Sequence, residues 1–294
     1  MKQKIILLVV LVVVVLGGAW FTLRKQTNRV SNNKLQVTTS FYPYYFFTSQ
    51  VGGDKVNVVN ITPPGGEPHD YEPTPQDIIN IESSKLLILN GNVEPWGNKI
   101  KDLLKGKNTV ILETGNGANS TDPHTWLSLK LAKVQVNSIL KELVQIDPQN
   151  TDYYQANANK LLAALDSLDR EYRTGLDNCS SKNIITSHAA FGYLAADYGL
   201  KQVPITGLSP DSEPSLQQLT DITQFAKANN VKYIFFESLV SPKLSQTIAS
   251  EVGAQTLVLN PVEGLTPSDL AQGRTYLTMM QDNLTNLKIA LNCK

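Results

Sequence analysis

Residues 151–176 have the sequence TDYYQANANKLLAALDSLDREYRTGL, and this stretch divides the chain in two. It contains no proline, and its one glycine is Gly175, close to its end. Apolar and aromatic side chains recur in it at spacings of four, three, four and four, at Leu161, Leu165, Leu168, Tyr172 and Leu176. That spacing is one face of an α-helix. The stretch therefore predicts a single uninterrupted helix, about 39 Å long.

Apolar, β-branched runs alternate with amphipathic runs on both sides of this helix. Strands are predicted over 35–40, 56–61, 85–90, 110–112, 183–186, 202–205, 233–236 and 256–259. Helices are predicted over 42–51, 74–79, 129–146, 215–229, 242–252 and 268–291. Strands that alternate with helices indicate parallel sheets. The predicted fold is α/β: two α/β lobes with parallel sheets, joined by a long rigid backbone helix.

The predicted organisation has four parts. They are a signal or anchor segment with a tether (1–34), an N-terminal α/β lobe (35–148), the linking helix (149–178) and a C-terminal α/β lobe (179–294). A single stiff helix between the lobes argues against a wide hinge motion.

The N-terminal segment indicates export. Lys2 and Lys4 precede an uncharged run over 5–23, which is close to the roughly 20 residues of a membrane-spanning helix. The run also resembles a secretory signal peptide, with Gly17 and Ala19 forming a weak cleavage site. The segment is interpreted either as a retained signal anchor or as a cleaved signal peptide. In either case we expect the body to lie outside the cytoplasm, anchored to the membrane by this helix or secreted after cleavage.

Charge and cysteine content narrow the class of protein further. The formal net charge is zero, but residues 1–35 hold six Lys or Arg and no acidic residue, so the remaining body is mildly acidic. It has no basic patch of the kind that nucleic-acid binding requires. The two cysteines, Cys179 and Cys293, predict one disulfide in an exported protein, with two free thiols as the alternative.

The chain has only three histidines, and each lies in a short turn: His69, His124 and His188. Imidazole is the commonest metal ligand and suits zinc. Ligands of open α/β sheets bind beyond the carboxyl ends of the strands, so two facing lobes would bring these turns to one cleft. The histidines are 55 and 64 residues apart, without a local chelate spacing. Each has an ordinary alternative as a helix cap, a surface turn residue or a buried, hydrogen-bonded side chain.

A closed tetrahedral zinc site needs a fourth ligand. The carboxylates near the predicted turns are candidates: Glu67, Asp70, Asp122, Glu237 and, in the turn 260–264 after the last strand, Glu263. Asn260 is neutral and a poorer ligand. Glu237 ends a strand, where its charge could orient a ligand histidine.

Several motifs, taken together and in order, resemble one family. They are SFYP (40–43), PHDYEP (68–73), DPHTW (122–126), ITSHAAFGY (185–193), FFES (235–238) and NPVEGLT (260–266). Residues 35–294 resemble the zinc and manganese solute-binding proteins of bacterial ABC transporters, of the zinc-uptake type (cluster A-I). The resemblance implies two lobes on a rigid helix with a metal site in the cleft between them. It implies His69, His124, His188 and Glu263 as ligands, with Glu237 and Asn260 as possible supporting residues.

The resemblance also implies a function without catalysis. A monomeric extracytoplasmic protein would capture Zn²⁺ and deliver it to an ABC permease. A manganese-binding homologue is an alternative, although three imidazoles and one carboxylate suit zinc better. A zinc-dependent hydrolase with water at the fourth position and a surface adhesin are further alternatives. One feature departs from many zinc-binding members: residues 113–122 contain no histidine-rich loop.

Overall fold

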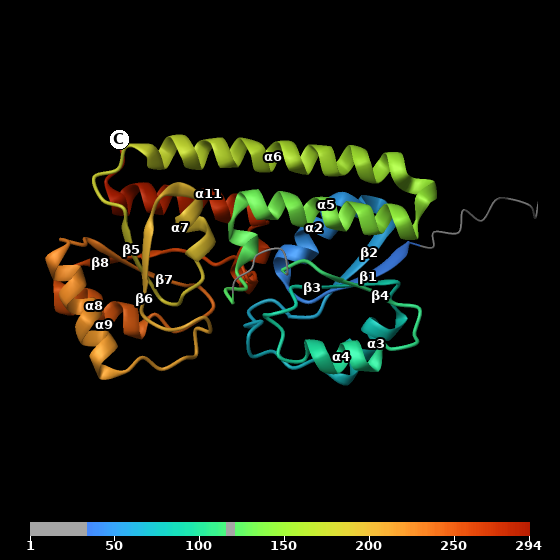
Figure 1. Ribbon diagram of the computed structural model, residues 1–294, viewed down its shortest axis with the longest axis horizontal. Helices are drawn as coiled ribbons and strands as arrows, with labels where there is room; N and C mark the ends of the chain where they lie inside the picture. The colour runs from blue at the N-terminus through green and yellow to red at the C-terminus, as the bar shows by residue number, and fades with distance from the viewer. Residues whose placement is uncertain (1–33, 116–120) are drawn as a thin grey trace, which may run out of the picture. The chain divides into compact units, whose positions relative to one another are not determined.

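The structure is a computed structural model that describes residues 34–115 and 121–294. Its strands form two four-stranded parallel sheets (Figure 1). The first has the order β2-β1-β3-β4 and contains β1 (Leu35–Thr39), β2 (Val56–Asn60), β3 (Leu86–Leu89) and β4 (Val110–Glu113). The second has the order β6-β5-β7-β8 and contains β5 (Asn183–Thr186), β6 (Lys201–Pro204), β7 (Tyr233–Phe236) and β8 (Gln255–Val258). The two lobes thus repeat one topology, and the predicted α/β class with two parallel sheets is confirmed.

Helices cover both faces of the first sheet, because its central strand is apolar on both sides. In β3, Leu86 and Ile88 belong to the main apolar core, with side chains of α2 (Tyr42–Gly52) and α5 (Leu129–Ile146). The alternate residues Leu87 and Leu89 pack with side chains of α3 (Pro75–Ser83) and α4 (Gly97–Leu103). A strand buried on both faces is characteristic of parallel sheets.

Helices also cover both faces of the second sheet. Ile185 and Ile234 pack with α8 (Leu216–Ala228) and α9 (Lys243–Val252) on one face. Ile184 and Phe235 belong to the main core, together with side chains of α7 (Gly192–Tyr198) and α11 (Tyr276–Leu291).

The predicted long helix is present as α6 (Thr151–Asp177), and it extends along both lobes in Figure 1. The five predicted core positions are all buried. The helix packs against α2 and α5 of the first lobe and against α11 and α7 of the second. One example is the buried hydroxyl of Tyr172, which donates to the carbonyl of Met280 (2.6 Å). Residues Leu35–Lys294 form one compact unit with a shared core, so the proposed boundaries at 148 and 179 stay predictions.

One predicted helix is wrong. Residues 268–291 do not form one helix but two, α10 (Pro267–Ala271) and α11. Gly273 has a φ of +65° and ends the first, since glycine enters the left-handed region at no steric cost. Thr275 then begins the second through a capping box with Thr278. The helix predicted over 74–79 continues to Ser83, and α4 was not predicted.

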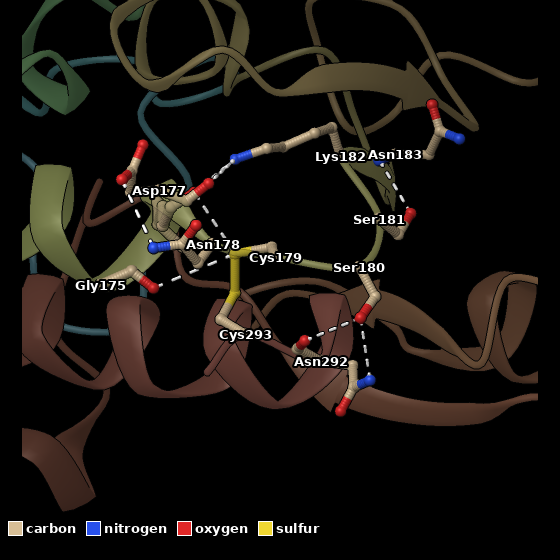
Figure 2. Close-up of a disulfide and its surroundings, with 11 residues drawn as sticks. Gly175, Asp177, Asn178, Cys179, Ser180, Ser181, Lys182, Asn183, Asn292 and Cys293 are labelled. Carbon is tan, nitrogen blue, oxygen red and sulfur yellow. Dashed lines mark hydrogen bonds between the residues drawn. A yellow bond between two sulfur atoms is a disulfide. The ribbon is translucent and has the colours of Figure 1, made fainter.

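The structure joins Cys179 to Cys293, as predicted from the even cysteine count. Figure 2 shows the bond between the segment that follows α6 and the segment that follows α11. Backbone hydrogen bonds reinforce it: the N–H of Ser180 donates to the carbonyl of Asn292 (3.3 Å), and that of Lys294 donates to Asn178 (3.0 Å). The bond fastens the end of the chain to the exit of the long helix.

The apolar run over 5–23 lies outside the described residues. Within 34–115 and 121–294, no helix is both long and apolar enough to cross a membrane.

Candidate metal centre

Four side chains from four turns meet at one point. Each turn follows a parallel strand: His69 follows β2, His124 follows β4, His188 follows β5 and Glu263 follows β8. The first lobe supplies two of them and the second lobe supplies two. This is the edge at which open α/β sheets place their ligands.

The local sequence shapes each histidine turn. At His124, a side-chain oxygen of Asp122 accepts the backbone N–H two residues on (3.0 Å), an Asx-type turn ahead of the short helix η2 (Thr125–Leu127). At His188, the carbonyl accepts from the hydroxyl of Thr186 (2.8 Å) and from the side-chain amide of Gln202 (2.9 Å). The β2–α3 loop ends at Thr74, which caps α3 through a capping box.

The ligand-type atoms of His69, His124, His188 and Glu263 all lie within 4.8 Å of one another. One carboxylate oxygen, Oε1 of Glu263, is 3.4 Å from Nε2 of His69, 3.4 Å from Nε2 of His124 and 3.7 Å from Nε2 of His188. The Nε2 atoms of His124 and His188 are 3.2 Å apart. Four donor atoms therefore surround one small volume.

Two of the histidines are oriented by carboxylates. Nδ1 of His124 lies 2.8 Å from Oδ1 of Asp122, and Nδ1 of His188 lies 2.7 Å from Oε1 of Glu237. A carboxylate at Nδ1 holds the proton there, which leaves the Nε2 lone pair directed at the common centre. Glu237, which was predicted to orient a histidine, contacts His188. Asp122, which was predicted as a possible ligand, instead contacts Nδ1 of His124 and is not in the four-residue cluster.

The electrostatics of the cluster reflect its burial; His124, His188 and Glu263 are all 0% exposed. Burial alone would raise the pKa of Glu263, but hydrogen bonds from His124, His188 and His69 hold it well below its ordinary value. Burial opposes protonation of His188, but hydrogen bonds to Glu237 and Glu263 outweigh it and raise its pKa to about 10. The pKa of His124 is also raised, because Asp122 and Glu263 outweigh its burial. Without a metal, the raised pKa of His188 favours a protonated imidazole there at neutral pH.

The other predicted fourth ligands lie outside the four-residue cluster. Glu67 is close to it: burial and the charge of Glu263 raise its pKa to about 9, and its Oε1 accepts the N–H of His69 (3.3 Å). Asp70 is exposed, and its pKa is raised chiefly by a hydrogen bond with Asp211.

Asn260 shapes the turn that carries Glu263. Its Oδ1 accepts the N–H of Val262 (2.7 Å), and its Nδ2 donates to Oγ of Ser238 (2.6 Å). Both polar groups of the amide are therefore occupied, one within the turn and one by Ser238, which follows β7.

Two residues at the site were not predicted. Trp126 donates its indole N–H to the carbonyl of Pro261 (2.7 Å), and the side chain of Asn283 pairs with the backbone of Asn260. The position of Trp126, two residues after His124, was a usable signal. Asn283 gave none, because it lies in the middle of a helix far along the chain.

Known proteins that resemble this chain are zinc-uptake and zinc-binding proteins. Residues 37–290 match the family model ZnuA, "Zinc-uptake complex component A periplasmic". The chain is 42% identical over 284 residues to the high-affinity zinc uptake system protein ZnuA of Bacillus subtilis (strain 168), with 89% of each chain covered. It is 38% identical over 292 residues to the zinc-binding lipoprotein AdcA of Streptococcus pneumoniae (strain R6), covering 92% of this chain but 58% of AdcA.

A solved structure agrees with the sequence matches. The Zn(II)-bound ZnuA-like domain of Streptococcus pneumoniae AdcA superposes with a TM-score of 0.79 at 39% identity. The match covers 88% of this chain and 100% of that domain. The chain thus spans somewhat more than half of AdcA and corresponds to its ZnuA-like domain.

Proposed function

The chain belongs to the ZnuA family of zinc-uptake components, and on that premise we propose that it is the extracytoplasmic zinc-binding component of an ABC transporter. It captures Zn²⁺ through His69, His124, His188 and Glu263 and delivers the ion to a membrane permease. Zinc is the cargo of this protein, which acts by binding and release.

The spacing of the four donor atoms is the observation that carries the proposal. A tetrahedral zinc ion with ligands at about 2.0–2.1 Å requires donor atoms about 3.3 Å apart. Four of the donor–donor separations are 3.2, 3.4, 3.4 and 3.7 Å. The other two separations, from His69 to each of the other histidines, are at most 4.8 Å, so the cluster approximates a zinc tetrahedron.

The donor set also favours zinc over manganese. Three imidazole nitrogens and one carboxylate suit a four-coordinate zinc ion, whereas manganese prefers more oxygen ligands. A second oxygen is available, because Oε2 of Glu263 is buried without a hydrogen-bond partner. Manganese would use both oxygens and would still be held by more nitrogen than it prefers.

A closed set of four protein ligands separates this proposal from a zinc hydrolase. Catalytic zinc sites keep one position open for water. Here Glu263 supplies the fourth donor atom and is fully buried. With that position filled by the protein, a bound ion is held rather than used to activate water.

Location outside the cytoplasm is part of the proposal. The apolar run over 5–23 would anchor the body to the membrane or direct its secretion. The family model is described as periplasmic, and AdcA is described as a lipoprotein. We propose that the body acts as a monomer on the outer side of the membrane, where a permease can receive its zinc.

The decisive experiment pairs metal analysis with two matched carboxylate variants. Protein purified without chelators should contain about one zinc, and zinc should outcompete manganese. Glu263→Gln should weaken zinc binding by about 100-fold, because one of four ligands loses its charge. Glu67→Gln is the control, because it replaces a carboxyl beside the cluster and keeps the side-chain oxygen that can accept the N–H of His69, so affinity should be nearly unchanged. The reverse result would show that Glu67 is the fourth ligand, and retained affinity in both variants would refute a carboxylate ligand.

A further inference from the structure

The turn that carries Glu263 has a backbone conformation that its sequence does not favour. Val262 has a φ of +57° and is fully buried. In the described part of the chain, only two other non-glycine residues have a positive φ, Asn230 and Asn292. Asparagine tolerates the left-handed region, but a β-branched residue there is strained. Surrounding contacts must therefore hold Val262 in place.

The second lobe supplies the first of these contacts. Asn283 of α11 pairs with the backbone of Asn260 on both sides: its Oδ1 accepts the N–H (2.8 Å), and its Nδ2 donates to the carbonyl (2.7 Å). Asn260 in turn accepts the N–H of Val262. These hydrogen bonds are buried, so water does not compete for them.

The first lobe supplies the other contact. Nε1–H of Trp126 donates to the carbonyl of Pro261, directly before the strained residue. The carbonyl of Trp126 itself accepts from the hydroxyl of Tyr276 (2.6 Å). Because Trp126 lies two residues after His124, one short segment bears both a proposed ligand and the contact that fixes the turn of another.

Burial alone does not account for Trp126. Its ring packs edge-on against Phe41, with centroids 4.8 Å apart, as an ordinary core residue would. Trp96 is also buried (2% exposed), but in the α3–α4 core of the first lobe. What distinguishes Trp126 is a directed hydrogen bond from one lobe to the ligand turn of the other.

We infer that Trp126 is a positioning residue, which with Asn283 holds the 260–264 turn in its strained form and thereby sets Glu263 against the three histidines. This inference rests on the proposed function, since it concerns the geometry of the same zinc site. Without the indole hydrogen bond, the turn can relax, and the carboxylate moves away from the common centre. The change would appear in metal geometry as well as in affinity.

The test compares Trp126→Phe with Trp96→Phe, each in the native background and in Glu263→Gln. Zinc affinity is measured by competition with a chromophoric chelator, and Co²⁺-loaded protein is examined by absorption spectroscopy, which reports coordination geometry. Trp126→Phe should weaken zinc binding by about 10- to 100-fold, the usual effect of removing a residue that orients a ligand. Trp96→Phe should change it little. In the Glu263→Gln background, Trp126→Phe should have no further effect, and its Co²⁺ spectrum in the native background should approach that of Glu263→Gln.

Asn283→Leu provides a second variant, with the same branching and number of side-chain heavy atoms but no hydrogen-bonding groups, should Trp126→Phe fold poorly. The same loss of affinity and the same lack of additivity are expected. Equal losses in Trp126→Phe and Trp96→Phe, or an additive loss in the Glu263→Gln background, would overturn the positioning role. If Glu263→Gln itself keeps full zinc affinity, the assignment of the ligand is wrong, which is a different failure.

Discussion

The two sides of the metal centre are built differently. His124 and His188 are fully buried, and each has a carboxylate at Nδ1. His69 lies in the loop between β2 and α3, and its side chain is 9% exposed. Its backbone N–H is held by Glu67 from within the same loop. One side of the site is fixed by both lobes, and the other depends on a single loop.

This difference suggests how zinc enters and leaves. A preformed set of His124, His188 and Glu263 loses little conformational freedom when it binds, which favours affinity. Loops are more mobile than the elements that they connect, so we expect His69 to be the proposed ligand that moves. Because α6 packs along both lobes, we expect loading to involve the His69 loop more than any change in the distance between lobes.

Alanine substitution of the histidines should give the largest losses of zinc affinity, and it compares the two sides of the site directly. His188→Ala removes a proposed ligand and leaves the buried Glu237 with the backbone N–H of residue 188 but without the imidazole, so zinc affinity should fall by about 1,000-fold. His69→Ala removes one ligand from the loop, and a fall of about 100-fold is expected. Chelator competition measures both, with circular dichroism to confirm folding. Equal losses would show that the two sides of the site contribute alike.

Removal of the orienting charge should have a smaller effect. Glu237→Gln keeps the size of the side chain but removes the anion at Nδ1 of His188, so zinc affinity should fall by about 10- to 100-fold. Glu94→Gln is a control for loss of a buried carboxylate, because Glu94 binds the backbone of Asn90 and Gly91 instead. If both variants bind zinc alike, zinc binding by His188 does not depend on the carboxylate of Glu237 at its Nδ1.

Zinc affinity should also depend on pH, because His188 on the buried side of the site must lose a proton. The raised pKa of His188, about 10, means that the metal-free protein carries a proton there at neutral pH, which zinc must displace. Affinity should therefore increase by about tenfold per pH unit for each displaced proton, and for His188 this increase should continue past the ordinary histidine pKa of about 6.5, up to about pH 10. Calorimetry in buffers of different ionisation enthalpy would count the protons. A flat affinity between about pH 6 and pH 8 would contradict a protonated site.

The same shift makes a prediction for the metal-free fold. A histidine whose pKa is higher in the folded than in the unfolded chain stabilises the fold fully below its unfolded pKa of about 6.5, and this contribution is lost as the pH rises toward 10. Thermal unfolding of metal-free protein should show this loss, and His188→Gln should reduce it.

The disulfide should have the smallest effect on zinc binding. Replacing Cys179 and Cys293 by serine removes a link between residues separated by 114 positions. The chain-entropy model gives a loss of about 4–5 kcal/mol in the free energy of unfolding, or a melting temperature roughly 10 °C lower. Zinc affinity should stay within about twofold, because the bond lies outside the four ligand turns. A large loss of affinity would show that the fixed side of the site depends on this distant link.

Much of the fold could be predicted because its signals are local. The helical spacing in α6, and the apolar runs of β5 and β7, gave the helix and strands almost to the residue. The error at 268–291 came from a glycine and a capping threonine within an otherwise helical pattern. Amphipathic periodicity continues through such a break, so it does not reveal where one helix ends and the next begins.

The sequence by itself determined the lobed α/β plan, the disulfide pair and the few residues able to bind zinc, because periodicity, cysteine number and histidine scarcity are properties of the chain. Only the tertiary structure decided that His69, His124, His188 and Glu263 share one centre and that Asp122 orients a ligand. It alone placed Trp126 against the turn of Glu263. These contacts join residues up to 194 positions apart, and their distances depend on how two sheets pack against one helix, which no local pattern encodes.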